Sequence, residues 1–130
     1  MVKLFCFVPL LVNFAMEIVR EIIFYKNHFE LFYKRLPGKV RKKVDYVLYM
    51  ISVTEHIPSK FFKSIENANG LFEVRIEYDS NIYRVFCCFE TGRLLVLFNG
   101  FQKKSQRTPN NELEKAKQIL DEYFNEKNTK

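Results

Sequence analysis

The sequence predicts an α+β fold: a small antiparallel sheet, formed by an N-terminal strand and a three-strand meander, with two N-terminal helices and a C-terminal helix packed on it. Three observations lead to this prediction. Apolar residues recur at helical spacing over residues 29–51, alternate with polar residues from residue 71, and return to helical spacing after Pro109. The length of 130 residues suits one domain with a buried core.

The composition excludes a disordered chain and favours an anionic partner. Hydrophobic residues make up 48% of the chain, with 14 Phe and 7 Tyr among them, which is enough apolar material for a core. The formal net charge of +6 favours nucleic acid, an acidic protein or a membrane surface as the partner, and charge alone does not choose among them.

The cysteines and histidines predict neither a disulfide framework nor a metal site. Cys6, Cys87 and Cys88 are odd in number, and neighbouring cysteines on a strand point to opposite faces. This usage is typical of a reducing cytoplasm, which is the predicted location. His28 and His56 lack metal-ligand spacing, and no glycine-rich phosphate loop is present. We therefore expect no metal and no cofactor.

Residues 1–15 allow three interpretations. Lys3 and the apolar run over residues 4–12 are similar to the start of a secretory signal, but the run is too short to span a bilayer and the cleavage pattern is poor. A second interpretation is an over-long gene prediction with the true start at Met16, and a third is a real strand or helix. We favour the second, which leaves residues 1–15 as an uncertain extension and residues 16–130 as a single domain.

A strand and a helix are expected first. Residues 20–25 are rich in β-branched and aromatic side chains, which favours a strand. Asn27 with Glu30 three residues later is similar to a capping box and predicts the start of a helix. The Pro-Gly pair at residues 37–38 ends this helix.

A second helix and a connector follow. The helix has one apolar face, made of Val40, Val44, Val47, Leu48 and Ile51. Arg41, Lys42, Lys43 and Asp45 lie off that face. Pro58 begins a short connector, and the Asn-Gly pair at residues 69–70 predicts a turn before the sheet.

Three strands are predicted at residues 71–78, 81–90 and 93–99, because polar and apolar residues alternate in the first of them and turn residues separate the runs. Thr108 then caps a C-terminal helix with Pro109 at its first position, where the missing N–H has no cost. The apolar stripe of this helix comprises Leu113, Ala116, Leu120, Tyr123 and Phe124.

The turn lengths predict the register of the meander. A two-residue turn at residues 79–80 places Arg75 opposite Arg84, and another at residues 91–92 places Arg84 opposite Asn99. One face then becomes apolar and is expected to lie under the first two helices: Phe72, Val74, Ile76, Tyr83, Val85, Cys87, Phe89, Leu94, Val96 and Phe98. The apolar half of the other face, expected under the C-terminal helix, holds Leu71, Phe86, Cys88, Leu95 and Leu97.

The remaining half of that second face predicts an anion site. Arg75, Arg84 and Asn99 form a row across three strands, and Lys103 and Lys104 follow in the next loop. Two arginines directly opposite each other repel, so the fold requires either neutralising carboxylates or a bound anion. The carboxylates available for the first alternative are Glu73 and Glu77.

Such a row suits RNA cleavage, because RNA supplies its own nucleophile, the 2′-hydroxyl. Arginine forks match the oxygens of a charged pentavalent phosphate. A lysine can serve as the base only where burial or neighbouring positive charge destabilises its ammonium form, and Lys103 beside Lys104 has such neighbours. The alternative for the two lysines is a solvated pair in a loop. Cys88 and the histidines remain open as reactive groups.

The stretches "GLFEVR" and "YRVFCCFETGRLLVLFNGFQKKSQRTPNNELEKA" resemble toxins of the RelE/HigB superfamily, particularly the phage-derived Gp49-like branch. The shared features are a glycine-aromatic-Glu-x-Arg strand, a Tyr-Arg strand and a closing GF-x-KK-x-x-(K/R)-TP pattern. The resemblance covers roughly residues 20–124. It implies a ribosome-dependent mRNA endoribonuclease and a cognate antitoxin, whose helix-turn-helix domain would bind promoter DNA. No membrane partner is implied.

The resemblance assigns expected roles residue by residue. Arg75, Arg84, Lys103 and Lys104 match the catalytic positions of the family, which grip RNA and stabilise the transition state. Arg107 matches a basic position that contacts phosphate or ribosomal RNA.

Two further positions in the closing stretch are expected RNA contacts. Phe101 can stack on a base or belong to the core. Asn99 stands where many relatives have His, and an amide cannot carry a proton at neutral pH. This departure keeps open a degenerate toxin that only binds antitoxin or RNA. The first 15 residues keep open a secreted or membrane-associated basic protein.

Overall fold

The computed structural model describes residues 17–91 and 93–129, so the predictions for residues 1–15 lie outside the described residues. The elements in chain order are β1 (Glu21–Phe24), α1 (His28–Lys34), α2 (Gly38–Val53), β2 (Phe62–Ser64), β3 (Phe72–Tyr78), β4 (Asn81–Glu90), β5 (Leu94–Lys103) and α3 (Asn110–Asn128). No helix in this part of the chain is long and apolar enough to cross a membrane.

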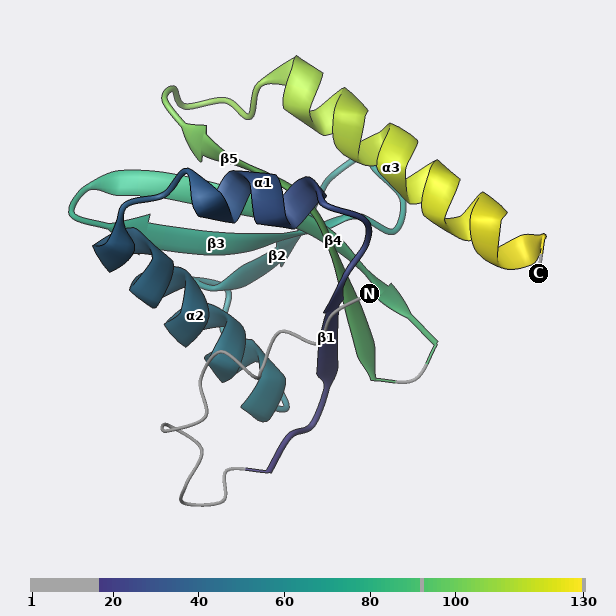
Figure 1. Ribbon diagram of the computed structural model, residues 1–130, viewed down its shortest axis with the longest axis horizontal. Coiled ribbons are helices and arrows are strands. Elements are labelled where there is room, and N and C mark those ends of the chain that lie inside the picture. The colour runs from purple at the N-terminus through teal and green to yellow at the C-terminus, as the bar shows by residue number, and fades with distance from the viewer. Residues whose placement is uncertain (1–16, 92, 130) are drawn as a thin grey trace.

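The predicted α+β class is confirmed, with one five-stranded sheet in the order β1-β5-β4-β3-β2 (Figure 1). β3, β4 and β5 form the expected antiparallel meander. Two details differ from the prediction. β1 runs parallel to β5, which makes the sheet mixed. The connector predicted after Pro58 contains a short edge strand, β2, which pairs with β3.

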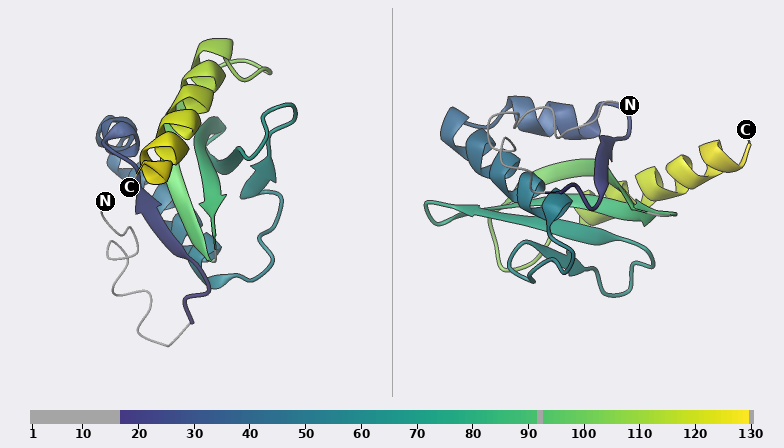
Figure 2. Two further views of the ribbon diagram at one scale, coloured as in Figure 1. Left: turned by 90° about the vertical axis from the view of Figure 1, so that its right-hand side faces the viewer. Right: turned by 90° about the horizontal axis from the view of Figure 1, so that it is seen from below.

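The helices cover both faces of the sheet. α1 and α2 pack on one face, where Phe29, Phe32 and Val44 meet Val74 and Val85 in the larger core. α3 packs on the other, where Ala116, Ile119 and Tyr123 meet Phe86, Cys88, Val96 and Phe98. The two further views in Figure 2 show these layers from the side and from below. The sheet is therefore buried on both faces over most of its length.

The structure contains the predicted helices and apolar stripes, but it differs from the prediction at the helix caps and in single residues. Neither Asn27 nor the residue before α3 makes a side-chain capping hydrogen bond, and Pro109 rather than Thr108 occupies the cap position of α3. In the α3 stripe, Ile119 is buried whereas Phe124 is 36% exposed. Packing on the curved sheet, rather than the sequence spacing alone, selects which side chains of the stripe are covered.

The register between β3 and β4 is confirmed. Tyr78 pairs with Asn81 across a two-residue turn, and Arg75 pairs with Arg84. Asp79 and Ser80 both have positive φ, at 51° and 68°, which is the conformation of a tight hairpin turn whose twist matches the strands.

The register between β4 and β5 differs from the prediction in two steps. Glu90 pairs with Leu94 rather than Arg93, so one more residue separates the strands, and Leu95 and Leu97 face α1 and α2 while Val96 and Phe98 face α3. A one-residue slip exchanges the faces of a strand in this way.

The second step is a β-bulge. Val85 pairs with Gly100 and Cys87 with Leu97, so that Phe98 and Asn99 together oppose a single residue of β4. As a result Arg84 pairs with Phe101, not with Asn99. β5 also continues to Lys103, four residues beyond its predicted end.

Candidate functional site

The centre of the candidate site is a pair of arginines on neighbouring strands. Arg75 on β3 lies directly opposite Arg84 on β4. Arg84 in turn pairs with Phe101 on β5, which belongs to the core under α3, so the pair lies on the α3 side of the sheet. Two guanidinium groups at directly opposite positions repel, and the arrangement therefore needs a counter-charge.

One carboxylate supplies this counter-charge for both arginines. Oε2 of Glu73 lies 3.3 Å from Nε of Arg75 and 3.4 Å from Nε of Arg84. The side chains of Glu73 and Arg84 are only 10% and 7% exposed, whereas that of Arg75 is 30% exposed. Within the described residues Glu77 forms no ion pair with either arginine. Two guanidinium groups thus share one contacting carboxylate, while Glu77 acts on Arg84 only at longer range.

Arg84 has hydrogen-bonding capacity left over. Its Nη1 donates to the carbonyl oxygen of Tyr83 at 3.1 Å. Its Nε is within ion-pair distance of Glu73 but is buried without an aligned hydrogen-bond partner among the described residues. Burial lowers the pKa of Arg84 from its usual value. The charge of Glu73 and, more weakly, that of Glu77 oppose this effect, whereas Arg75 adds to it. A buried guanidinium in a positive cluster suits the oxygens of an anion such as phosphate.

Arg75 is fixed by a segment that the sequence did not reveal as part of the site. Its backbone N–H donates to the carbonyl oxygen of Phe61 at 2.7 Å, and its Nη1 donates to the carbonyl oxygen of Ser59 at 3.3 Å. Ser59 and Phe61 lie just before β2. Residues 58–64 show neither strict alternation nor a long β-branched run, so only the pairing with β3 identifies this edge strand.

The basic residues of the closing stretch lie beside this pair. Lys103 ends β5 opposite Ile82 and is half-buried. It follows Phe101 by two residues, so it shares a face with Arg84. Lys104 and Arg107 are exposed just beyond the strand. In the described part of the chain none of these three cations forms an ion pair, so all three remain available to an anionic ligand.

Asn99 and Phe101 lie in the core rather than on the surface. The Nδ2 of Asn99 donates to the backbone oxygen and to Oε1 of Glu112, at 3.2 and 3.1 Å, which ties β5 to the first turn of α3. The Oδ1 of Asn99 is buried with no hydrogen-bond partner among the described residues. The ring of Phe101 is 7% exposed and stacks on Phe86 with ring centres 5.5 Å apart.

The two neighbouring cysteines of β4 are held in an unreactive form. Cys87 is fully buried, and its thiol lies 3.6 Å from the carbonyl oxygen of Phe72. Burial raises the pKa of Cys87, and it raises the pKa of Cys88 to about 12, so neither is a thiolate at neutral pH. His28 has its pKa lowered, first by burial and then by Lys115. In the described ranges no three His, Cys, Asp or Glu residues gather in a group that could hold a metal ion.

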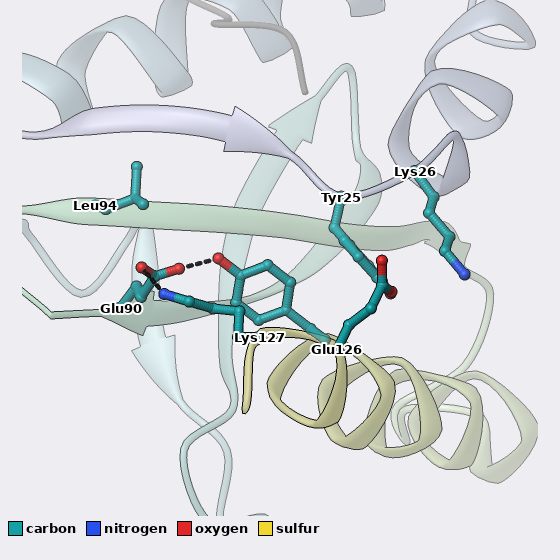
Figure 3. Close-up of a pocket in the computed structure, with 7 residues that line it drawn as sticks. Tyr25, Lys26, Glu90, Leu94, Glu126 and Lys127 are labelled. Carbon is teal, nitrogen blue, oxygen red and sulfur yellow. Dashed lines mark hydrogen bonds and ion pairs between the residues drawn. The ribbon is translucent and has the colours of Figure 1, made fainter. Parts of the chain in front are cut away.

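A separate cavity of about 630 Å³ lies at the far end of α3, between that helix, β1 and the β4–β5 hairpin. Tyr123 and Lys127 both donate to Glu90, and Figure 3 shows Lys127 directed at that carboxylate. The hydroxyl of Tyr25 lies within hydrogen-bond distance of the carboxylates of Glu122 and Glu126. Because these polar groups satisfy one another, the cavity is better described as the place where α3 is fastened to the sheet.

The comparisons with known proteins place the chain in a family. No curated protein sequence matches the chain significantly. The model of the family described as "Phage derived protein Gp49-like (DUF891)" matches residues 32–121, which is more than half of the chain and includes Arg75, Arg84, Lys103 and Lys104. The protein therefore belongs to the Gp49-like family, a member of the RelE/HigB-like toxin–antitoxin superfamily.

Proposed function

We propose that the protein is a toxin that cleaves mRNA on the translating ribosome and is held inactive by a cognate antitoxin. The family supports a toxin–antitoxin role and an antitoxin partner. The observation that carries the enzymatic part is the Arg75–Arg84 pair, whose two guanidinium groups share one contacting carboxylate, Glu73, and lie on the same face of the sheet as Lys103.

The chemistry proposed for this cluster is attack by the 2′-hydroxyl of RNA on the adjacent phosphorus. A bond forms between O2′ and phosphorus, and the bond from phosphorus to the 5′-oxygen of the next nucleotide breaks. The 2′-hydroxyl gives its proton to a base, and the leaving oxygen takes one up. The products are a 2′,3′-cyclic phosphate and a 5′-hydroxyl. RNA itself supplies the nucleophile, so this route requires no metal.

The residues take distinct parts in this reaction. Arg84 and Arg75 stabilise the additional negative charge of the pentavalent phosphate, which is the role that electrostatic preorganisation serves best. Lys103 and Lys104 hold the neighbouring phosphates, and one of them is the candidate for proton transfer. Arg107 contacts the RNA backbone further along the exposed loop. Because Asn99 and Phe101 are committed to the core, we assign them support of the site rather than direct contact with RNA.

The test is induced expression in bacteria, with growth and mRNA integrity as the measurements. Wild-type protein should arrest growth and fragment translated mRNA. Both effects should disappear in Arg84→Ala and in the Lys103→Ala/Lys104→Ala double variant. Because Arg84 is buried, co-purification with the antitoxin serves as the folding control. Full toxicity in both variants, each shown to bind the antitoxin in the co-purification, would contradict the proposal.

Asn99 favours a second candidate, a degenerate toxin that binds its antitoxin or RNA without cleavage. The side chain is 3% exposed, its amide is bonded to Glu112, and it cannot carry a proton. This candidate expects normal growth on expression of wild-type protein together with intact antitoxin binding.

A further inference from the structure

The surface of α2 carries basic charge that the proposed catalytic cluster does not use. Lys39, Lys43 and Tyr46 follow one another at positions i, i+4 and i+7, so they form one stripe along the helix; we call these three residues the α2 stripe. Within the described residues neither lysine forms an ion pair.

The positive charge at the start of α2 opposes the preference of a helix N-terminus for negative charge. The first turn of α2 contains no acidic residue, and Lys39 stands there although the N-terminus of a helix favours negative charge. Lys43 follows one turn later. The fold therefore keeps cations where they weaken the free helix, and an anionic ligand would compensate for their repulsion.

Tyr46 provides a flat apolar surface one turn beyond Lys43. It is 43% exposed, and Nζ of Lys43 lies 5.4 Å from the centre of its ring. The ring packs edge-on against Phe61, with ring centres 6.3 Å apart at 80°. Tyr46 thus packs against a core aromatic and keeps part of its surface exposed beside a cation, which suits stacking on a base.

The α2 stripe is continuous with the arginine pair through the segment before β2. Nζ of Lys60 lies 5.0 Å from the ring centre of Phe61. A third cation therefore lies beside the ring against which Tyr46 packs. The carbonyl oxygen of Ser59 accepts the bond from Nη1 of Arg75 at 3.3 Å. The contacts therefore lead from α2 around the β2–β3 edge to Arg75, whose partner Arg84 lies on the face covered by α3.

We propose that this path is a binding track for single-stranded RNA, along which Lys39, Lys43 and Lys60 hold phosphates and Tyr46 stacks on a base. The proposal rests on the proposed function, because the track ends at the arginine pair where cleavage would occur. Alternating cations and an exposed aromatic ring suit a nucleic-acid strand, since a stacked base requires a ring whereas an acidic peptide requires only charge. The track would position the part of the RNA outside the cleaved bond.

The test compares two non-cleavable 2′-O-methyl RNA oligonucleotides by fluorescence anisotropy with the full-length protein. One is about 4 nucleotides long and fills the arginine pair alone, and the other is about 16 nucleotides long and can reach the α2 stripe. Tyr46→Ala should weaken binding of the longer RNA about tenfold and leave the shorter RNA unaffected. Lys43→Ala should reduce the salt dependence for the longer RNA by about 0.7 in slope.

Matched controls separate stacking and local charge from general effects. Tyr46→Phe keeps the ring and should bind as the wild type does, while Lys117→Ala removes an equal charge from α3 and should leave the slope for the longer RNA unchanged. Thermal unfolding verifies that each variant folds. Unchanged affinity of Tyr46→Ala for the longer RNA would overturn the track. So would a variant that loses antitoxin binding while it keeps its affinity for the longer RNA.

The failure of the track is distinguishable from the failure of the proposed function. If wild-type protein does not cleave mRNA on ribosomes, the proposed function fails whatever the oligonucleotides show. If it cleaves normally and Tyr46→Ala binds the longer RNA as tightly as wild type does, only the track is wrong.

Discussion

Glu73 is the residue whose replacement tests the architecture of the site most sharply. Its Oε2 lies 3.3 and 3.4 Å from the Nε atoms of Arg75 and Arg84. Glu73→Gln removes the charge while keeping the shape, and it leaves two guanidinium groups side by side. At an effective dielectric constant of about 20, each lost contact is worth about 5 kcal/mol of Coulomb energy. Breaking one partner out of a buried ion pair typically costs about 3–5 kcal/mol.

We therefore predict that Glu73→Gln lowers the free energy of unfolding by about 3 kcal/mol, the low end of that range, because Arg75 is 30% exposed and can turn to water. Urea unfolding followed by circular dichroism measures the change. Glu77→Gln is the matched control, since it makes the same charge change at an exposed position of the same strand, and it should cost less than about 0.5 kcal/mol.

Added phosphate extends the same experiment to ligand binding. With Glu73 neutralised, the two arginines lack their counter-charge, so phosphate should restabilise Glu73→Gln more than it stabilises the wild type. Equal losses for Glu73→Gln and Glu77→Gln would refute the shared-carboxylate argument. A phosphate effect no larger in Glu73→Gln than in the wild type would refute the interpretation of the pair as an anion site.

Three further predictions concern the framework of the site. In Gly100→Ala the new Cβ would lie 2.6–2.9 Å from ring carbons of Phe32, so we expect a loss of about 2 kcal/mol in urea unfolding, partly recovered in the double variant with Phe32→Leu; no loss would mean that β5 does not approach α1 so closely. Burial raises the pKa of Cys88 from 9.0 to about 12, so the folded state holds this proton more tightly than the unfolded state. The stability that this protonated thiol contributes is complete below about pH 9 and is lost as the pH rises towards 12. If the urea midpoint falls with pH as steeply in Cys88→Ala as in the wild type, this prediction is wrong. Tyr123→Phe removes the hydroxyl that donates to Glu90 and should cost about 1.5 kcal/mol, with faster hydrogen exchange confined to α3, whereas unchanged exchange there would show that this bond does not fasten the helix.

The sequence allows the arginine pair to be predicted because its geometry depends on local features. The alternation in β3 fixes which residues share a face, and the two-residue turn at Asp79 and Ser80 fixes the register with β4. Arg75 and Arg84 follow from these two features alone. The sharing of one carboxylate does not follow, because Glu73 and Glu77 both flank the arginines in the sequence and only the folded sheet distinguishes them.

The position of Asn99 could not be predicted, because it depends on two compensating irregularities. One extra residue in the β4–β5 connection shifts the pairing by one, and the bulge at Phe98 and Asn99 shifts it once more. Together they move the partner of Arg84 from Asn99 to Phe101 while keeping both on the same face. The close approach of Gly100 to α1 arises from tertiary packing, for which a glycine in the sequence is only a general signal.

Mapping RNA ends in a purified translation system shows directly whether the protein is a ribosome-dependent endoribonuclease. We predict that wild-type protein cuts mRNA only while ribosomes translate it, leaving 2′,3′-cyclic phosphate and 5′-hydroxyl ends. We also predict that Arg84→Ala, folded as judged by antitoxin binding, leaves the mRNA intact. Uncut mRNA with wild-type protein, or cuts bearing 5′-phosphate ends, would contradict the proposed function.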